Sequence, residues 1–219
     1  MASSQKEHDE RASALRVERA IVELRRGRRI DVLDSHGVAV VAAIERLDPD
    51  EVSDFVAADG SLSLVLTPER GEALGLVGHL SALEIALPGD TSVQSILRLT
   101  TGMTSIGDEH VEPFRVGQAD PRAAAALTLA RHAKIIPALA TCDPAEDRAD
   151  LPLLQVSIED IENYPLIRGR ELQCVSRARV PLAASENCEL IVYRERFGAA
   201  EHGAIVIDSA GAAPVKQPG

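Results

Sequence analysis

Apolar and polar residues are arranged along most of the chain so that short strands and helices are predicted in turn. Compact apolar runs rich in β-branched residues predict buried strands, whereas apolar residues at helical spacing predict helices with one buried face. Asp120-Pro121 and Thr67-Pro68 are typical helix starts, because the first residue can cap the helix and proline suits its first turn. The predicted strands span 30–34, 38–44, 61–66, 83–87, 92–99, 135–140 and 153–156, and the predicted helices span 15–26, 48–59, 67–75 and 122–134, with a short one from 157.

The two ends of the chain follow other patterns. Residues 1–14 are polar and charged, which predicts a disordered tail. Beyond Tyr164-Pro165, predicted strands at 174–180, 189–193 and 203–208 follow one another without helices, and this indicates a separate small β unit. Alternating strands and helices before that point predict an α/β (α+β) domain. The predicted division is a tail (1–14), an α/β (α+β) domain (15–168) and a β unit (169–219).

Charge and cysteine content narrow the possible classes of function. The formal net charge is -11, so the chain lacks the basic surface that nucleic-acid binding needs. The arginines at 25–29 form one dense basic cluster, which we interpret as the solvated end of a helix, with contact to a phosphate as the alternative. The chain has three cysteines, an odd number, and they lie far apart in the sequence at Cys142, Cys174 and Cys188. This pattern favours a protein of a reducing compartment over a disulfide framework or a zinc site. With neither a signal peptide nor a membrane-spanning apolar run, we expect a cytoplasmic protein with no membrane partner.

Five stretches resemble 3,4-dihydroxy-2-butanone 4-phosphate synthase, an enzyme family of riboflavin biosynthesis. They occur in the order in which that family has them and cover about 150 residues. The resemblance implies the fold of the synthase and a dimer with its sites near the subunit interface. The stretches are 17–28 with the following strand to Asp34, 64–76, 100–103, 126–142 and 156–161.

The remainder of the chain resembles the opening strands of GTP cyclohydrolase II. The similar stretches are Arg179-Val180-Pro181, 190–196 and 201–206. Fused proteins of these two parts occur in riboflavin synthesis, some with a degenerate first half, and the chain is most similar to that kind. The resemblance implies that the zinc ligands and triphosphate-binding arginines of the cyclohydrolase lie beyond the end of this sequence. Cys174 and Cys188 precede that region and are spaced too widely for two ligands on one turn.

Three departures from the synthase pattern affect the expected chemistry. Where the family has an acidic loop that binds magnesium and the sugar phosphate, this chain has Asp34-Ser35-His36-Gly37, which offers few of the oxygen ligands that a hard cation needs. The family's Gly-His-Thr-Glu motif, whose histidine is a metal ligand, falls at about residues 121–124, and the guanidinium of Arg122 cannot ligate a metal. The late catalytic glutamate of the family aligns with Asp143. One surviving carboxylate cannot perform the acid and base steps of a skeletal rearrangement.

Six residues remain as candidates for a vestigial site. Asp34, His36 and Asp143 are the pocket candidates, although a polar turn residue such as His36 needs no functional explanation. Thr100, Thr101 and Arg122 are the candidate ligand-binding residues, since the stretch at 100–103 lies at the substrate pocket in the synthase. A plain strand end is the alternative for the two threonines. We expect no metal and no cofactor.

The leading hypothesis from the sequence is a GTP cyclohydrolase II-like protein that is not catalytic on its own and serves as a scaffold, dimerisation or regulatory module. One alternative is a divergent enzyme acting on a sugar phosphate, and another is a small-molecule-binding sensor. The small side chains of Ala123–Ala126 and the open edges of an incomplete β unit predict a homodimer. A separate cyclohydrolase catalytic unit is the other expected partner.

Overall fold

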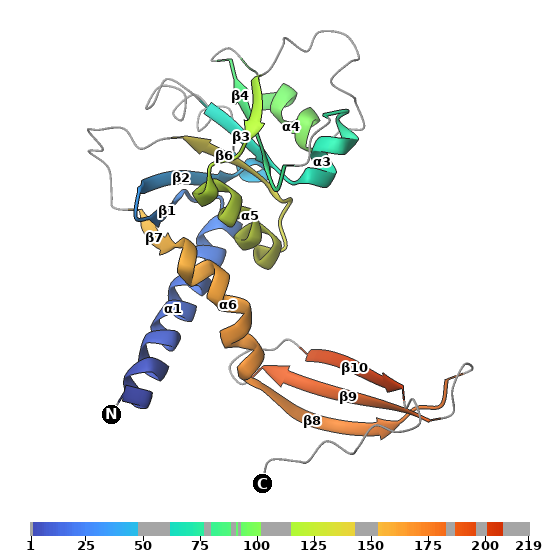
Figure 1. Cartoon of the computed structure of the whole chain (residues 1–219). Coiled ribbons are helices and arrows are strands. Elements are labelled where there is room, and N and C mark those ends of the chain that lie inside the picture. The colour runs from blue at the N-terminus through green and yellow to red at the C-terminus, as the bar shows by residue number, and fades with distance from the viewer. Residues whose placement is uncertain are drawn as a thin grey trace. The chain divides into compact units, whose positions relative to one another are not determined.

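The computed structural model describes residues 2–47, 62–76, 80–88, 91, 93–101, 115–142, 153–182, 187–195 and 201–207. The chain divides into two compact units, Met1–Tyr164 and Pro165–Gly219. The boundary predicted from the sequence, between 168 and 169, falls inside the helix that continues from the first unit into the second (Figure 1).

The first unit is built on a seven-stranded sheet with the order β5-β4-β3-β6-β2-β1-β7. Neighbouring strands are antiparallel, except that β1 and β7 are parallel. A tight turn joins β1 to β2, and Asp34 pairs with Gly37 at its base. The strands are β1 (Ile30–Asp34), β2 (Gly37–Ala43), β3 (Leu62–Leu66), β4 (Leu83–Leu87), β5 (Arg115–Gln118), β6 (Ala138–Cys142) and β7 (Leu154–Ser157).

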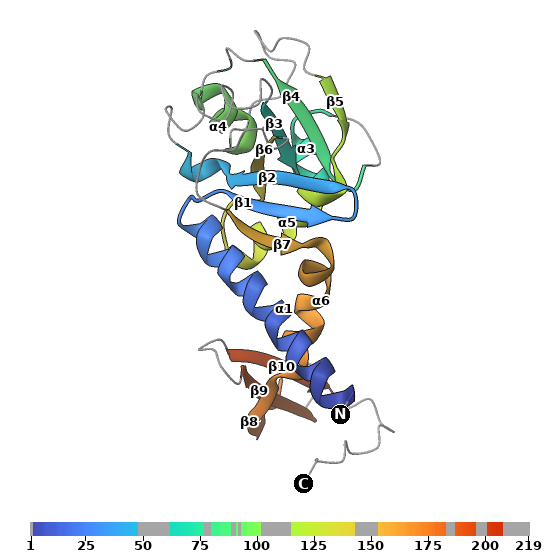
Figure 2. The same cartoon turned by 90° about the vertical axis from the view of Figure 1, so that its left-hand side faces the viewer.

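Helices cover both faces of this sheet. On one face, Ile96 and Leu99 of α4 (Val93–Thr101) join a buried cluster with alternate residues of β3, including Leu64 and Leu66. That face also carries α3 (Pro68–Ala73) and the short 3-10 helix η1 (Ile44–Arg46). Because successive strand residues point to opposite faces, Val65 faces the other side. There α5 (Pro121–Ala133) packs against the strands and against α1 (Ala2–Arg25). Figure 2 shows α1 lying beside β1 and β7.

Helix α6 (Ile158–Arg170) begins in a reciprocal cap that also anchors α1. The Ser157 hydroxyl accepts a hydrogen bond from the Asp160 backbone N–H at 3.1 Å, and the Asp160 carboxylate accepts one from the Ser157 N–H at 3.5 Å. Arg16 of α1 donates two hydrogen bonds to the same carboxylate, both 2.7 Å long. Asp160 is only 7% exposed, whereas the Arg16 side chain is 47% exposed, so this fork is a partly buried link between α1 and α6.

The second unit is a three-stranded antiparallel sheet with the order β10-β9-β8. Its strands are β8 (Leu172–Arg179), β9 (Cys188–Glu195) and β10 (Glu201–Ile207). Arg168, near the end of α6, holds the base of this sheet by bonding Glu171 and Glu195. Edge strand β10 exposes three consecutive apolar residues: Ile205 is 59% exposed, Val206 47% and Ile207 59%.

The mixed α/β fold and most of its elements agree with the sequence-based prediction. The arginines at 25–29 lie at the end of α1 as expected, where Arg26 and Arg28 pair with Glu23. The cysteines are free thiols. Among the described residues, no helix is long and apolar enough to cross a membrane. The predicted helix at 48–59 lies outside the described residues.

Three elements differ from the prediction. Residues 92–99 were expected to form a strand, but most of them belong to helix α4, in which Ile96 and Leu99 share one buried face at a spacing of three. Residues 2–14 were expected to be a disordered tail, but they form the first turns of α1. This segment contains no glycine or proline, and Gln5 bonds Asp9 one turn later at 3.1 Å. Strand β5 was not predicted, because its residues are exposed and show no apolar alternation.

Candidate functional site

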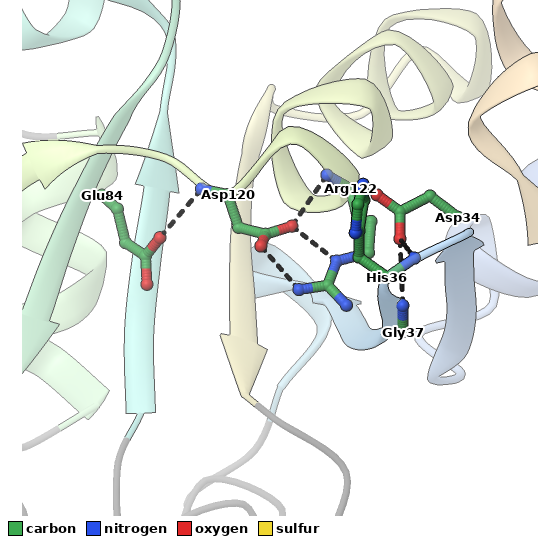
Figure 3. Close-up of polar contacts among 6 residues, drawn as sticks. All are labelled: Asp34, His36, Gly37, Glu84, Asp120 and Arg122. Atoms are coloured by element: carbon green, nitrogen blue, oxygen red, sulfur yellow. Dashed lines mark hydrogen bonds and ion pairs between the residues drawn. The ribbon is translucent and has the colours of Figure 1, made fainter.

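The candidate site lies where the β1–β2 turn meets the first turn of α5 (Figure 3). The turn is held by the Asp34 carboxylate, whose Oδ1 accepts hydrogen bonds from the backbone N–H groups of His36 at 2.7 Å and Gly37 at 3.0 Å. Aspartate commonly stabilises a turn through such bonds to the backbone that follows it. His36 is exposed at the tip of the turn, and its backbone N–H, rather than its imidazole, makes the bond to Asp34.

Arg122 reaches this turn from the start of α5. A Cβ atom placed on Gly37 would lie 2.8 Å from Nη1 of Arg122, so the guanidinium packs directly against the glycine backbone. Gly37 has a φ of +153°, which side-chain-bearing residues rarely adopt. The position therefore needs glycine for its backbone conformation and also because of the arginine beside it.

Asp120 fixes the guanidinium of Arg122. Its Oδ1 accepts from the Arg122 backbone N–H at 2.8 Å, as a helix cap, and from Arg122 Nε at 2.8 Å. Its Oδ2 accepts from Arg122 Nη2 at 2.6 Å, which completes a two-pronged ion pair. The side chain of Arg122 is 15% exposed and that of Asp120 is 33% exposed. The hydrogen bond from the Arg122 side chain holds the pKa of the Asp120 carboxyl below its usual value.

Glu84 of β4 ties this ion pair to the sheet. Its Oε2 accepts a hydrogen bond from the Asp120 backbone N–H at 3.2 Å. The order of contacts is therefore Glu84, Asp120, Arg122 and then the Gly37 backbone of the turn, as Figure 3 shows. The sequence predicted Asp120 as a helix cap, which is confirmed, but it gave no sign of the fork to Arg122 or of the support from Glu84.

The other predicted site residues lie elsewhere. Thr100 and Thr101 end helix α4, with Thr100 buried and Thr101 exposed. Arg70 of α3 donates to the backbone carbonyls of Leu99 at 2.8 Å and Arg98 at 3.3 Å, at this same end. Since α4 and α5 cover opposite faces of the sheet, the structure does not join the two threonines and Arg122 into one cluster on a single face. Asp143, the third pocket candidate, lies outside the described residues.

The described part of the site does not suit a divalent cation. Asp34 Oδ1 accepts from two backbone N–H groups, and both carboxylate oxygens of Asp120 accept from Arg122. The group of α5 that lies against Gly37 is the Arg122 guanidinium, which is itself a cation. Magnesium requires several oxygen ligands around one position. Within the described ranges, no group of three or more His, Cys, Asp or Glu side chains could hold a metal ion.

Comparisons with curated proteins find two relatives that carry the same name. No family model matches the chain. It is 30% identical over 204 residues to a GTP cyclohydrolase-2 from Azospirillum brasilense, covering 87% of this chain and 53% of that protein. A GTP cyclohydrolase-2 from Xylella fastidiosa is 26% identical over 213 residues, covering 93% of this chain and 52% of that protein. The chain is thus related by sequence to proteins named GTP cyclohydrolase-2, over about half of their length.

Comparison with solved structures shows which fold the chain has. A two-domain 3,4-dihydroxy-2-butanone 4-phosphate synthase from A. baumannii superposes with a TM-score of 0.54 at 19% identity, covering 88% of this chain and 70% of that one. The synthase of Candida albicans gives a TM-score of 0.53 at 17% identity, covering 68% of this chain and 96% of that one. The dihydroxybutanone phosphate synthase-like fold that the sequence predicted is thus confirmed. The chain spans about half the length of the curated relatives that it matches.

Proposed function

We propose that this relative of GTP cyclohydrolase-2 proteins is a noncatalytic module of riboflavin biosynthesis, which forms a dimer and assists a cyclohydrolase catalytic unit. The observation that carries the proposal is that Asp34 and Asp120, the described carboxylates beside the β1–β2 turn, are bonded within the chain. Asp34 is engaged by the turn that it stabilises, and Arg122 is engaged by Asp120. Proton transfer in a reaction needs a carboxylate or imidazole within hydrogen-bond reach of the substrate. Here the carboxylates at the site serve the fold.

The β unit supports a role in association. Strand β10 is an edge strand, and Ile205 and Ile207 lie two residues apart on the same side of it, each 59% exposed. Leu190 of β9 pairs with Ile205 and extends this apolar side across the sheet. Exposed apolar edge strands favour pairing with another chain. We therefore propose that β10 contacts a second copy of the chain.

Helix α5, which the sequence suggested as a dimer contact, does not support that part of the proposal. Ala123 and Ala126 are fully buried in the first unit, where α5 packs on the sheet and on α1. These small side chains allow close packing within the unit, whereas Ala124 and Ala125 of the same helix are partly exposed. The homodimer proposal therefore depends mainly on the β unit.

Prolonged incubation of the purified chain with GTP tests the noncatalytic role. We expect no loss of GTP, followed by chromatography, beyond the loss in a reaction without protein. A matched sample of Arg122→Ala controls for contaminating enzymes, because a contaminant would act equally in both preparations. Turnover of GTP that increases in proportion to the concentration of the purified chain, and that survives further purification, would contradict the proposal.

A further inference from the structure

The positively charged guanidinium of Arg122 lies beside the β1–β2 turn. The guanidinium of Arg122 lies against Gly37, immediately beside the carboxylate-bonded turn formed by Asp34. Arg122 is largely buried, with 15% of its side chain exposed. An arginine keeps its charge at all ordinary pH values and presents a rigid planar fork. The charge beside the turn is therefore permanent and fixed in position.

Asp120 and Glu84 hold that charge in place. Three hydrogen bonds of 2.6 to 2.8 Å join Asp120 to the backbone and side chain of Arg122. Glu84 accepts from the backbone of Asp120, so the support extends to β4, the strand beside edge strand β5. These hydrogen bonds fix the Arg122 side chain in one position. A side chain fixed in this way is suited to stabilising the fold and poorly suited to binding a mobile ligand.

The synthase resemblance implies a magnesium ion at this place, but the residues present do not fit one. The loop has lost its run of carboxylates, and the position that aligns with a metal-ligating histidine is Arg122 itself. The carboxylates that the structure does place here, Asp34 and Asp120, are bonded to N–H groups of the chain. A divalent cation at the turn would have to approach the guanidinium closely, which like-charge repulsion opposes.

We propose that the Arg122 guanidinium takes the place of a divalent cation at the β1–β2 turn, so that the turn is held by a tethered charge and does not respond to metal. The inference concerns the first unit alone. It holds whether or not the chain assists a cyclohydrolase. It predicts metal binding and amide hydrogen exchange, neither of which depends on enzymatic activity.

Manganese binding tests the inference first. Mn²⁺ is titrated into the full-length chain and into Asp34→Asn, at constant ionic strength, and free Mn²⁺ is measured by its paramagnetic resonance signal. We expect the two proteins to give the same curve, because the turn is not a metal site. A saturable component that is present in the wild-type chain and absent from Asp34→Asn would overturn the inference.

Hydrogen exchange at the turn tests it independently. Arg122→Ala removes the guanidinium that packs against Gly37, and Asp120→Asn removes its charged anchor. Either change should speed exchange of the His36 and Gly37 amides by about tenfold, since loss of packing loosens local structure. Asp120→Asn keeps a residue that caps helices well, which protects the fold. Arg131→Ala, an exposed arginine near the other end of α5, is the control and should leave the turn unchanged. Wild-type exchange at both amides in Arg122→Ala and Asp120→Asn would overturn the inference.

Discussion

Replacing Asp160 with alanine is expected to lower the free energy of unfolding of the first unit by about 2–3 kcal/mol, because hydrogen bonds to charged groups are strong and this residue makes several. The substitution removes both bonds from Arg16 and the reciprocal cap with Ser157. Urea denaturation measures the change. Glu159→Ala is the matched control, since Glu159 also lies in the first turn of α6 but is exposed. Equal stability of the two variants would contradict the assigned role of Asp160.

The same residue gives this prediction a pH dependence. Burial alone would raise the pKa of the Asp160 carboxyl, but hydrogen bonds from Arg16, Ser13 and Ser157 outweigh it and lower the pKa from 3.8 to about 2. A carboxyl whose pKa is lower in the folded state stabilises the fold above its unfolded pKa. Its contribution should therefore be complete above about pH 4 and should disappear as the pH falls from there through about 2. Asp160→Ala should lose this part of the acid sensitivity.

The double variant Ile205→Glu, Ile207→Glu is expected to convert a dimer into a single chain. Two carboxylates on the exposed side of β10 would place like charges at the proposed contact between copies, and charged residues on edge strands prevent edge pairing. Light scattering should return about twice 23.4 kDa for the wild-type chain and 23.4 kDa for the variant.

Val116→Glu is the control for that experiment. Val116 is also an apolar residue on an edge strand, β5 of the first unit, and is 39% exposed. This variant should remain a dimer. A wild-type mass of one chain, or a double variant that stays dimeric, would contradict the assignment of the contact to β10.

Elements with local signals were predicted well from the sequence. The caps at Thr67 and Asp120 are confirmed because capping depends on residues within one turn of each other. Strand β1 was placed at its observed bounds because its apolar run is short and ends in a turn. Helix α4 was missed because an apolar run of this length fits a strand or a helix equally, and its burial against β3 decides between them.

The site could be predicted only in part. Family resemblance associated Arg122 with a lost metal-ligand position, and the structure brings it to the turn that follows Asp34. The fork to Asp120 and the bond to Glu84 depend on where β4 and α5 lie in three dimensions. No spacing in the sequence encodes that arrangement, so these partners became apparent only from the fold.

Incubation with ribulose 5-phosphate and magnesium tests the central claim most directly, because it supplies both the substrate and the cation of the enzyme that the first unit resembles. If Arg122 takes the place of the divalent cation and the carboxylates of Asp34 and Asp120 serve the fold, the purified chain will form no dihydroxybutanone phosphate above the background without protein. Product that increases with the concentration of the chain and is abolished in Asp34→Asn would contradict the account.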